Sequence, residues 1–376
     1  MFNLAKSAEQ TDLADALRQL GQRAIRPLMT HGGHPSSADL QRVWRDLHGM
    51  GLTAPVGDDA PDASTAVLIA EEAGFADPGV GYDLVSRSRA AAMIDTLGSA
   101  EQREAYLPAL IAGAGAGVAY FEGFGRSPRE LRTLARRTGE GWELTGRKIG
   151  VIRPGDLQVV VAADAERGAL LAFVVEPGTD GITVTRDDRE VGKLGADAVA
   201  TANIELAAVR LPESARLAVD GETAHLAAGG DLAVHRHVAA LRIGLAAVLL
   251  GTARAELAYA ADYANTRVAF GQPIAQYQGV AFPLVEVDME IDTSRLLVWK
   301  AAADIETLTD IPTIIERSAD VVSRCQRTVL EAGRHGINTL GGHGFIQDHP
   351  MEQWHRGSAT LAGLDFDPLE TDCVVL

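Results

Sequence analysis

The stretch Arg267-Val-Ala-Phe-Gly-Gln-Pro-Ile-Ala-Gln-Tyr-Gln278 separates two long apolar segments that both have helical periodicity. Its Phe-Gly-Gln-Pro core is an ordinary turn between helices, because glycine and proline interrupt regular structure. Arg267 before the turn and Gln278 after it are less ordinary, since both side chains can point out of the turn as hydrogen-bond donors. A second glycine-rich turn, Gly341-Gly-His-Gly-Phe345, lies further along, again between helical segments.

The segment around these turns, from residue 221 to residue 376, is predicted to be a helical bundle. Its apolar residues follow the helical period over Leu241–Asn265, Phe282–Leu308 and Ile311–Ala332. These lengths suit an antiparallel four-helix bundle that is closed by the segment after Gly344. A bundle with such large apolar areas often packs against a second copy of itself.

The two preceding parts of the chain have different periods. Residues 118–220 contain short runs rich in β-branched residues, separated by Gly, Pro and Asp, which predict a compact β domain with strands over 142–146, 157–162, 170–175, 182–185 and 202–206. Residues 1–117 read as a helical domain from residue 8 onward. Within it, Ser99 and Gln102 form a capping box that begins a helix ended by Gly113, and another helix over Ala66–Ala73 is predicted to end at Gly74. The fold class is therefore α+β with three domains.

The composition of the chain restricts the classes of partner that it is expected to bind. The chain has 376 residues and a formal charge of -17, from 34 basic and 51 acidic residues, which disfavours nucleic acid or an anionic membrane surface as the main partner. No membrane-spanning segment and no metal site is predicted, since no uninterrupted apolar run of about 18 residues and no metal-ligand spacing occurs. The two cysteines, Cys325 and Cys373, and the lack of a signal-peptide pattern favour the cytoplasm.

Three further segments carry a family resemblance. They are Leu97–Pro108 with its Gly-x-x-Glu-Gln-x-x-x-Tyr-Leu-Pro pattern, Phe173–Ile182, and the tripeptide Lys193-Leu-Gly195. Together with the two turns and the order of the domains, they resemble the acyl-CoA dehydrogenase family over nearly the whole chain. The resemblance implies FAD as cofactor and the α,β-dehydrogenation of an acyl thioester, in fatty acid or polyketide metabolism.

The same resemblance implies the residues that hold the adenine-diphosphate end of FAD across a subunit interface. They are Arg267, Phe270, Gln278, Gly341 and Gly342. Two structural alternatives stay open, because Gln278 could be a plain polar residue at a helix start and the glycines could be plain helix C-caps. Each residue alone is a weak signal, whereas their spacing together is specific.

The positions that correspond to the flavin-ring site depart from the family pattern. Where the family has a Thr-Glu-Pro loop, this chain has Phe121 and keeps Glu122. In the second ring-side segment, an aromatic residue is replaced by Gly150 and a hydroxyl residue by Ile152. Both losses concern the isoalloxazine half of the cofactor.

The catalytic base also departs from the pattern. Counting from Arg356-Gly-Ser-Ala359 places the base at Asp365, where most of the family has glutamate. A minority carries the glutamate before an arginine that matches Arg242, but the residue there is Leu241. Asp365 could act as a shortened base, and a displacement of about 1 Å can cost ~100-fold in rate. Alternatively, Asp365 only caps or solvates the chain end.

The residues that contact the substrate are less clearly marked in the sequence than those assigned to FAD. Ser127 matches a residue that contacts the pantetheine arm in the family, and Arg242 is assigned to the substrate side. Arg132, together with Arg126 and Arg129, could meet a phosphate of CoA or of a carrier protein, or could form a solvated basic edge. His235 and His237 lie near the expected active-site mouth, although isolated histidines are more often structural.

Two functions from different classes follow. The first is an FAD-dependent acyl-CoA or acyl-carrier-protein dehydrogenase that passes electrons to an electron-transfer flavoprotein or similar acceptor, as a dimer or tetramer in which a different subunit could complete the site. The second is a co-opted fold without flavin redox chemistry, either a binding subunit or a non-redox enzyme. A flavin-dependent oxygenase is a weaker third option, because it needs the same ring site.

Overall fold

The computed structural model describes residues 6–29, 35–123, 131–187, 193–217 and 229–364. Its N-terminal part is helical, with α1 (Ala8–Leu20), η1 (Gly21–Ile25), α2 (Arg26–Met29), α3 (Ser37–Gly49), η2 (Gly57–Asp59), α4 (Ala63–Ala76), α5 (Pro78–Leu97) and α6 (Ala100–Ile111). The capping box predicted at the start of α6 is confirmed, because the Ser99 hydroxyl accepts from the Gln102 backbone while the Gln102 side chain accepts from the Ser99 backbone.

A β domain follows. Its strands are β1 (Ala116–Ala119), β2 (Leu134–Thr138), β3 (Gly141–Ile152), β4 (Leu157–Asp164), β5 (Leu170–Val175), β6 (Ile182–Asp187) and β7 (Thr201–Pro212), with η3 (Glu213–Ala215) after them. Within the described residues they form one sheet in the order β1-β4-β2-β3-β7-β6, and β5 pairs with β4. The five predicted strands are all present.

Two strands were missed by the sequence reasoning. β1 begins at Ala116, so the expectation that residues up to 117 are helical is wrong at its end. This strand is fully buried and only four residues long, so it has no polar alternation to reveal it. β2 carries two arginines and a mostly exposed face, and it is stabilised by pairing with β3 rather than by its own composition.

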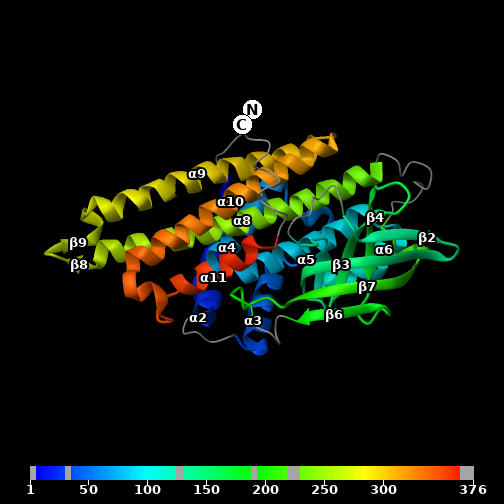
Figure 1. Cartoon of the computed structure of the whole chain (residues 1–376), viewed down its shortest axis with the longest axis horizontal. Coiled ribbons are helices and arrows are strands. Elements are labelled where there is room, and N and C mark those ends of the chain that lie inside the picture. Colours follow the sequence, from blue (N-terminus) through cyan, green and yellow to red (C-terminus); the bar gives the residue numbers. More distant parts are fainter. Residues whose placement is uncertain (1–5, 30–34, 124–130, 188–192, 218–228, 365–376) are drawn as a thin grey trace.

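The C-terminal part is the predicted four-helix bundle in the described part of the chain. It consists of α8 (Gly229–Thr266), the hairpin of β8 (Val268–Ala269) and β9 (Gln272–Pro273), η4 (Ile274–Gln276), α9 (Gln278–Thr307), α10 (Ile311–Leu340), η5 (Gly341–Phe345) and α11 (Met351–Ala362). Figure 1 shows α8, α9 and α10 running side by side, with the β8–β9 hairpin at the end farthest from the sheet.

The prediction that this helix ends at Gly74 is wrong, because α4 continues to Ala76. Gly74 is needed for close packing instead, because a Cβ at this position would overlap the Val248 backbone on α8 and lie 2.7 Å from its Cα. Gly251 on α8 makes the reciprocal approach, since its Cβ would meet the Glu71 backbone. The two helices therefore touch backbone to backbone, which holds the N-terminal domain against the bundle.

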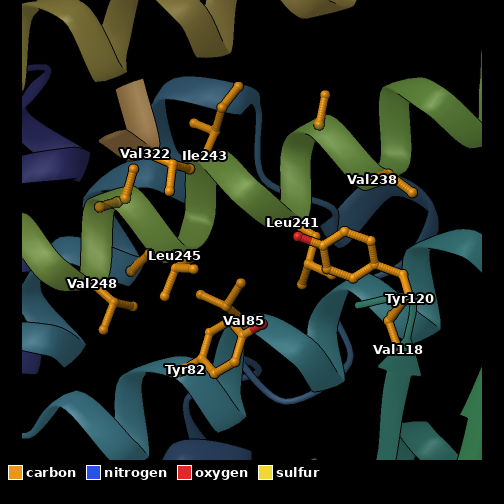
Figure 2. Close-up of a cluster of buried hydrophobic side chains, with 14 of the residues drawn as sticks. Tyr82, Val85, Val118, Tyr120, Val238, Leu241, Ile243, Leu245, Val248 and Val322 are labelled. Carbon is orange, nitrogen blue, oxygen red and sulfur yellow. The ribbon is translucent and has the colours of Figure 1, made fainter. Parts of the chain in front are cut away.

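Helix α8 is the central core element. Leu241, Leu245 and Val248 project from it toward Tyr82 and Val85 of α5 in the apolar cluster of Figure 2. Among the described residues, α8 is the one helix long and apolar enough to cross a membrane, over Gly230–Thr266, but 83% of its most apolar window is buried in the protein. A helix that is apolar on all sides is expected at the centre of a large core.

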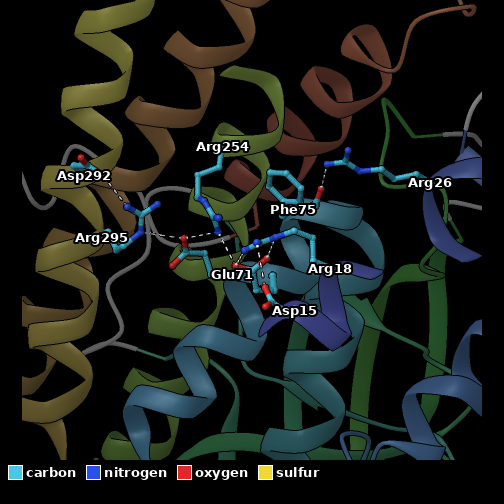
Figure 3. Close-up of polar contacts among 9 residues, drawn as sticks. Asp15, Arg18, Arg26, Glu71, Phe75, Arg254, Asp292 and Arg295 are labelled. Carbon is cyan, nitrogen blue, oxygen red and sulfur yellow. Dashed lines mark hydrogen bonds and ion pairs between the residues drawn. The ribbon is translucent and has the colours of Figure 1, made fainter. Parts of the chain in front are cut away.

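An ion-pair network joins four helices beside this core (Figure 3). Glu71 accepts from Arg254 Nη1 at 2.7 Å and from Arg295 Nε at 3.1 Å. The adjacent Glu72 accepts from Arg18 Nη2 at 2.8 Å and from Arg254 Nη1 at 3.1 Å. Burial raises the pKa of Glu72, but the Arg254 and Arg18 charges outweigh it, so the net pKa is lowered. The network ties α1 and α4 to α8 and α9.

Candidate functional site

The first predicted turn forms the exposed tip of the β8–β9 hairpin. Phe270 is 98% exposed and has a positive φ of 51°, a conformation unusual for a non-glycine residue. The Arg267 backbone is held by Tyr263 O and Ile274 N, at 2.8 and 2.9 Å, while its side chain is exposed. Gln278 is the first residue of α9 and is also exposed. All three predicted cofactor residues of this turn therefore face outward on a fixed backbone.

The second predicted turn lies at the same end of the bundle. Gly341 ends α10 with a φ of 59°, which favours glycine, and its N–H bonds Asn338 and Ile337 carbonyls. A Cβ on Gly341 or Gly342 would meet nothing within 4 Å, so both glycines leave open space. Gly341 is thus a helix C-cap, as the structural alternative holds, and a role in ligand binding stays a prediction.

A hydrogen bond connects the two turns. The Tyr263 hydroxyl, one helical turn before Arg267, lies 2.9 Å from Nδ1 of His343 in the second turn. Tyr259 bonds His349 Nδ1 at 2.7 Å one turn earlier on α8. The structure therefore brings both turns to one end of the bundle, where Arg267, Phe270 and Gln278 are exposed.

The ring-side positions are packed into the protein. A Cβ on Gly150 would overlap the Leu364 Cδ2 methyl, so Leu364 occupies the space beside this glycine. Ile152 and Phe121 are buried in the main apolar core. The polar residue that follows, Arg153, turns inward and donates from Nε to the buried Asp83 carboxylate at 2.7 Å. Leu364, Ile152 and Phe121 have no polar side-chain group, and Arg153 is already paired with Asp83.

Glu122, which the family pattern retains, forms a structural clamp. Its carboxylate accepts from the fully buried Lys148 Nζ at 2.8 Å and from the backbone N–H groups of Arg132 and Thr133 at 2.6 and 2.9 Å. Burial raises the pKa of Glu122, but the Lys148 charge and these hydrogen bonds give a net lowering. The carboxylate therefore joins the end of β1 to the start of β2 and to β3.

Of the two candidate positions for the catalytic base, Leu241 is part of the apolar core. Leu241 is buried beside Tyr120 and Val238 in the apolar cluster of Figure 2. Arg242 is buried and donates from Nη1 to Ser318 Oγ at 2.9 Å, so its guanidinium faces α10. Its assignment to the substrate stays a prediction. Asp365 and Ser127 lie outside the described residues.

Of the two histidines singled out in the sequence, His235 has a structural contact. Its Nε2 lies 3.3 Å from Asp231, which also accepts from the Leu170 backbone at 2.7 Å. His237 instead lines a cavity of about 350 Å³ between α4, α5, α8 and α9, together with Arg89. Sequence reasoning missed Arg89, because α5 also carries Asp83, Arg87 and Asp95 and its pattern does not single out one polar residue. Within the described residues, no group of His, Cys, Asp and Glu is placed to hold a metal ion.

Comparisons with known proteins agree with this architecture. The acyl-CoA dehydrogenase N-terminal domain model matches residues 7–114, and the C-terminal domain model matches residues 228–363. An acyl-CoA dehydrogenase of Bacillus subtilis is 30% identical over 361 residues, which cover 93% of this chain and 92% of that protein. The chain therefore belongs to the acyl-CoA dehydrogenase family.

Relatives in this family differ in reaction. A 3-sulfinopropanoyl-CoA desulfinase of Paraburkholderia xenovorans is 29% identical over 373 residues, with 94% of this chain and 93% of that protein covered. Among solved structures, butyryl-CoA dehydrogenase from Megasphaera elsdenii superposes with a TM-score of 0.82 at 23% identity, covering 99% of this chain and 98% of that one. The fold is thus shared by relatives whose names state different activities.

Proposed function

We propose that this chain is a subunit of an FAD-dependent dehydrogenase that oxidises an acyl thioester, carried by CoA or by a carrier protein, in the cytoplasm. The observation that carries the proposal is the adenine-side constellation. Arg267, Phe270 and Gln278 are exposed on an ordered turn, and the open glycine turn at Gly341 lies at the same end of the bundle. Family membership over 93% of the chain supports the same assignment.

These residues fit the nucleotide half of FAD. Arg267 is an exposed cation suited to the diphosphate, and the exposed Phe270 ring is suited to contact with a flat base. When bound, FAD supplies the acceptor for the hydride that leaves the β-carbon of the acyl group. Asp365 is proposed to take the proton from the α-carbon, and Ser127 and Arg242 are proposed to contact the thioester substrate.

We further propose that the active form is a dimer or tetramer. The described residues of α9 carry exposed apolar side chains along one face, namely Phe282, Val285, Met289 and Leu296. Their spacing follows the helical period, and such an apolar stripe is suited to cover by a second chain. The covering chain is either a second copy or a related, different subunit, and an electron-transfer flavoprotein or similar protein accepts the electrons.

A co-opted, redox-free role is the second candidate. Leu364 lies against Gly150, and Arg153 is paired with Asp83. Both Ile152 and Phe121 are buried in the core. These side chains fill or satisfy the ring-side positions, so in this alternative the acyl pocket persists without flavin chemistry.

The visible absorption spectrum of the purified chain, before and after addition of FAD, tests the proposal. A bound-flavin spectrum that is bleached by an acyl-CoA under anaerobic conditions supports dehydrogenation. A chain that stays colourless alone but binds FAD with a co-purifying subunit supports the mixed oligomer. A protein that stays colourless in both conditions supports the redox-free role. Asp365→Asn should abolish bleaching and leave flavin binding unchanged, and persistent bleaching would show that the base is another residue.

A further inference from the structure

Tyr263, near the end of α8, contacts both glycine-rich turns at the exposed end of the bundle. Its backbone carbonyl accepts from the Arg267 backbone N–H at 2.8 Å, which holds the start of the first turn. Its side-chain hydroxyl lies 2.9 Å from Nδ1 of His343 in the second turn, 80 residues further along the chain. One residue therefore connects the two turns directly, through its backbone on one side and its side chain on the other.

A second tyrosine–histidine bond lies beside the first. Tyr259 is one helical turn before Tyr263 on α8, and its hydroxyl lies 2.7 Å from Nδ1 of His349. The centroids of the His343 and His349 rings are 5.3 Å apart, and the Tyr263 ring meets the His349 ring edge-on at 6.2 Å. These four side chains form one contiguous Tyr–His cluster. Because a phenol hydroxyl can donate or accept, each bond forms with either tautomer of the imidazole.

The Tyr–His cluster ties the second turn to α8. The other contacts of the turn are with α10, since the Gly341 N–H bonds the last carbonyls of that helix, and a Cβ on Gly344 would lie 2.9 Å from the Ile337 Cα. No side chain caps η5. Among the described residues, the two tyrosine–histidine bonds are the side-chain hydrogen bonds that join residues 341–350 to α8. The distance between the second turn and the end of α8 therefore depends on them.

The inner part of the cluster packs against buried residues, whereas its outer part is exposed. Trp354 on α11 is 2% exposed and meets the Tyr259 ring edge-on at 6.0 Å. The Arg26 guanidinium lies 4.8 Å from the centroid of the Trp354 ring and covers it from another side. The bond between Tyr263 and His343, in contrast, is at the surface. The cluster thus carries the order of the core outward to the surface between the two turns.

We propose that Tyr263 and His343 are positioning residues of the nucleotide site. Their hydrogen bond holds the second turn at the distance from the first turn that the adenine-diphosphate part of FAD requires. This inference rests on the proposed function and adds to it two residues that act on FAD affinity through the turns rather than by contact. A turn that is already in place loses less conformational freedom on binding than one that must be ordered, so it binds more tightly.

Isothermal titration of the full chain, in the oligomer in which it purifies, measures the affinity for FAD and for ADP, which carries the adenine-diphosphate half alone. Tyr263→Phe keeps the ring and the backbone bond to Arg267 and removes only the hydroxyl. We expect this variant to bind FAD and ADP more weakly by the same factor, about 2- to 10-fold, which is the effect of one hydrogen bond. The matched control is Tyr106→Phe on α6, which removes a hydroxyl that donates to Glu176 and should leave both affinities unchanged.

A double-mutant cycle tests whether the two side chains act through one bond. His343→Leu should weaken binding by the same factor as Tyr263→Phe, and His343→Asn, which keeps a polar group near the position of Nδ1, should retain part of the affinity. The variant with both Tyr263→Phe and His343→Leu should bind no more weakly than the weaker single variant. Hydrogen exchange without added ligand gives a second readout, because amides of residues 341–349 should exchange about 2- to 10-fold faster in both single variants at an unchanged melting temperature.

The possible outcomes separate this inference from the proposed function. Wild-type affinity or wild-type exchange in Tyr263→Phe overturns the positioning role and leaves FAD binding intact. Effects that multiply in the double variant show that His343 acts on the ligand independently of Tyr263, which also overturns it, as does a loss of FAD affinity without a loss of ADP affinity. A wild-type chain that binds neither FAD nor ADP, alone or with a co-purifying subunit, overturns the proposed function and this inference together.

Discussion

Replacing Glu122 with glutamine removes the carboxylate that, among the described residues, pairs with the buried ammonium of Lys148. The Lys148 side chain is fully buried, with Nζ 2.8 Å from Glu122 Oε1 and 3.1 Å from the Tyr120 carbonyl. A carbonyl alone does not balance the charge. Removing one partner of a buried pair typically costs about 3–5 kcal/mol of unfolding free energy.

The titration of Lys148 sets an upper limit on this cost. In the Glu122→Gln variant, Lys148 can escape the penalty by losing its proton, which costs about 1.4 kcal/mol for each pH unit below its unfolded pKa of about 10.4. The limit is therefore about 4.6 kcal/mol at pH 7 and about 1.9 kcal/mol at pH 9. Because the folded pKa of Lys148 is depressed in the variant, the folded state binds fewer protons than the unfolded one, and stability rises with pH. We expect a loss of about 3–4 kcal/mol at pH 7 that falls below about 2 kcal/mol at pH 9.

Chemical denaturation, followed by circular dichroism at pH 7 and pH 9, measures these values. Glu205→Gln, at an exposed position of β7, is the matched control and should change stability by less than about 0.5 kcal/mol. Lys148→Met in the Glu122→Gln background should recover part of the loss, since the buried charge is then gone. A loss below about 1 kcal/mol at pH 7, or one that is the same at both pH values, would refute the reasoning.

Two further experiments test the contact between α4 and α8 and the buried carboxyl of Glu256 on α8. Gly74→Ala should destabilise the protein by about 3 kcal/mol or prevent folding, because its Cβ would overlap the Val248 backbone, whereas Gly279→Ala, in open space on α9, should gain up to about 1 kcal/mol in thermal unfolding. Equal effects of the two substitutions would contradict the close helix contact. Burial raises the pKa of Glu256, and neither of its carboxylate oxygens has a hydrogen-bond partner among the described residues. In the folded protein, Glu256 keeps its proton at pH values above about 4.3, the pKa of a glutamate in the unfolded chain. The folded state therefore binds more protons than the unfolded state there, and stability falls as pH rises. Glu256→Gln should therefore raise the melting temperature more at pH 8 than at pH 5, and equal shifts would show that Glu256 does not titrate in this range.

Local signals made the helical parts of the fold predictable. Ser99 and Gln102 are three residues apart, and their mutual capping depends only on the backbone of one helical turn. The bundle helices follow from apolar periodicity and from glycine-rich turns at Phe270 and Gly341. The strand β1 was missed, because four buried residues carry no periodic pattern, and the end of α4 was misplaced at Gly74. That glycine serves a contact with a helix far away in the sequence.

By itself, the sequence determined the order of the domains, the helices of the bundle and the family to which the chain belongs. These properties depend on residue patterns over short windows and on turns. Only the tertiary structure decided that Glu122 is paired with Lys148, that Leu364 lies against Gly150, and that Arg89 faces a cavity beside His237. Each of these partners comes from a distant segment. Desolvation and charge compensation arise only when such segments pack together, so no local pattern in the chain can reveal which polar groups are left for a ligand.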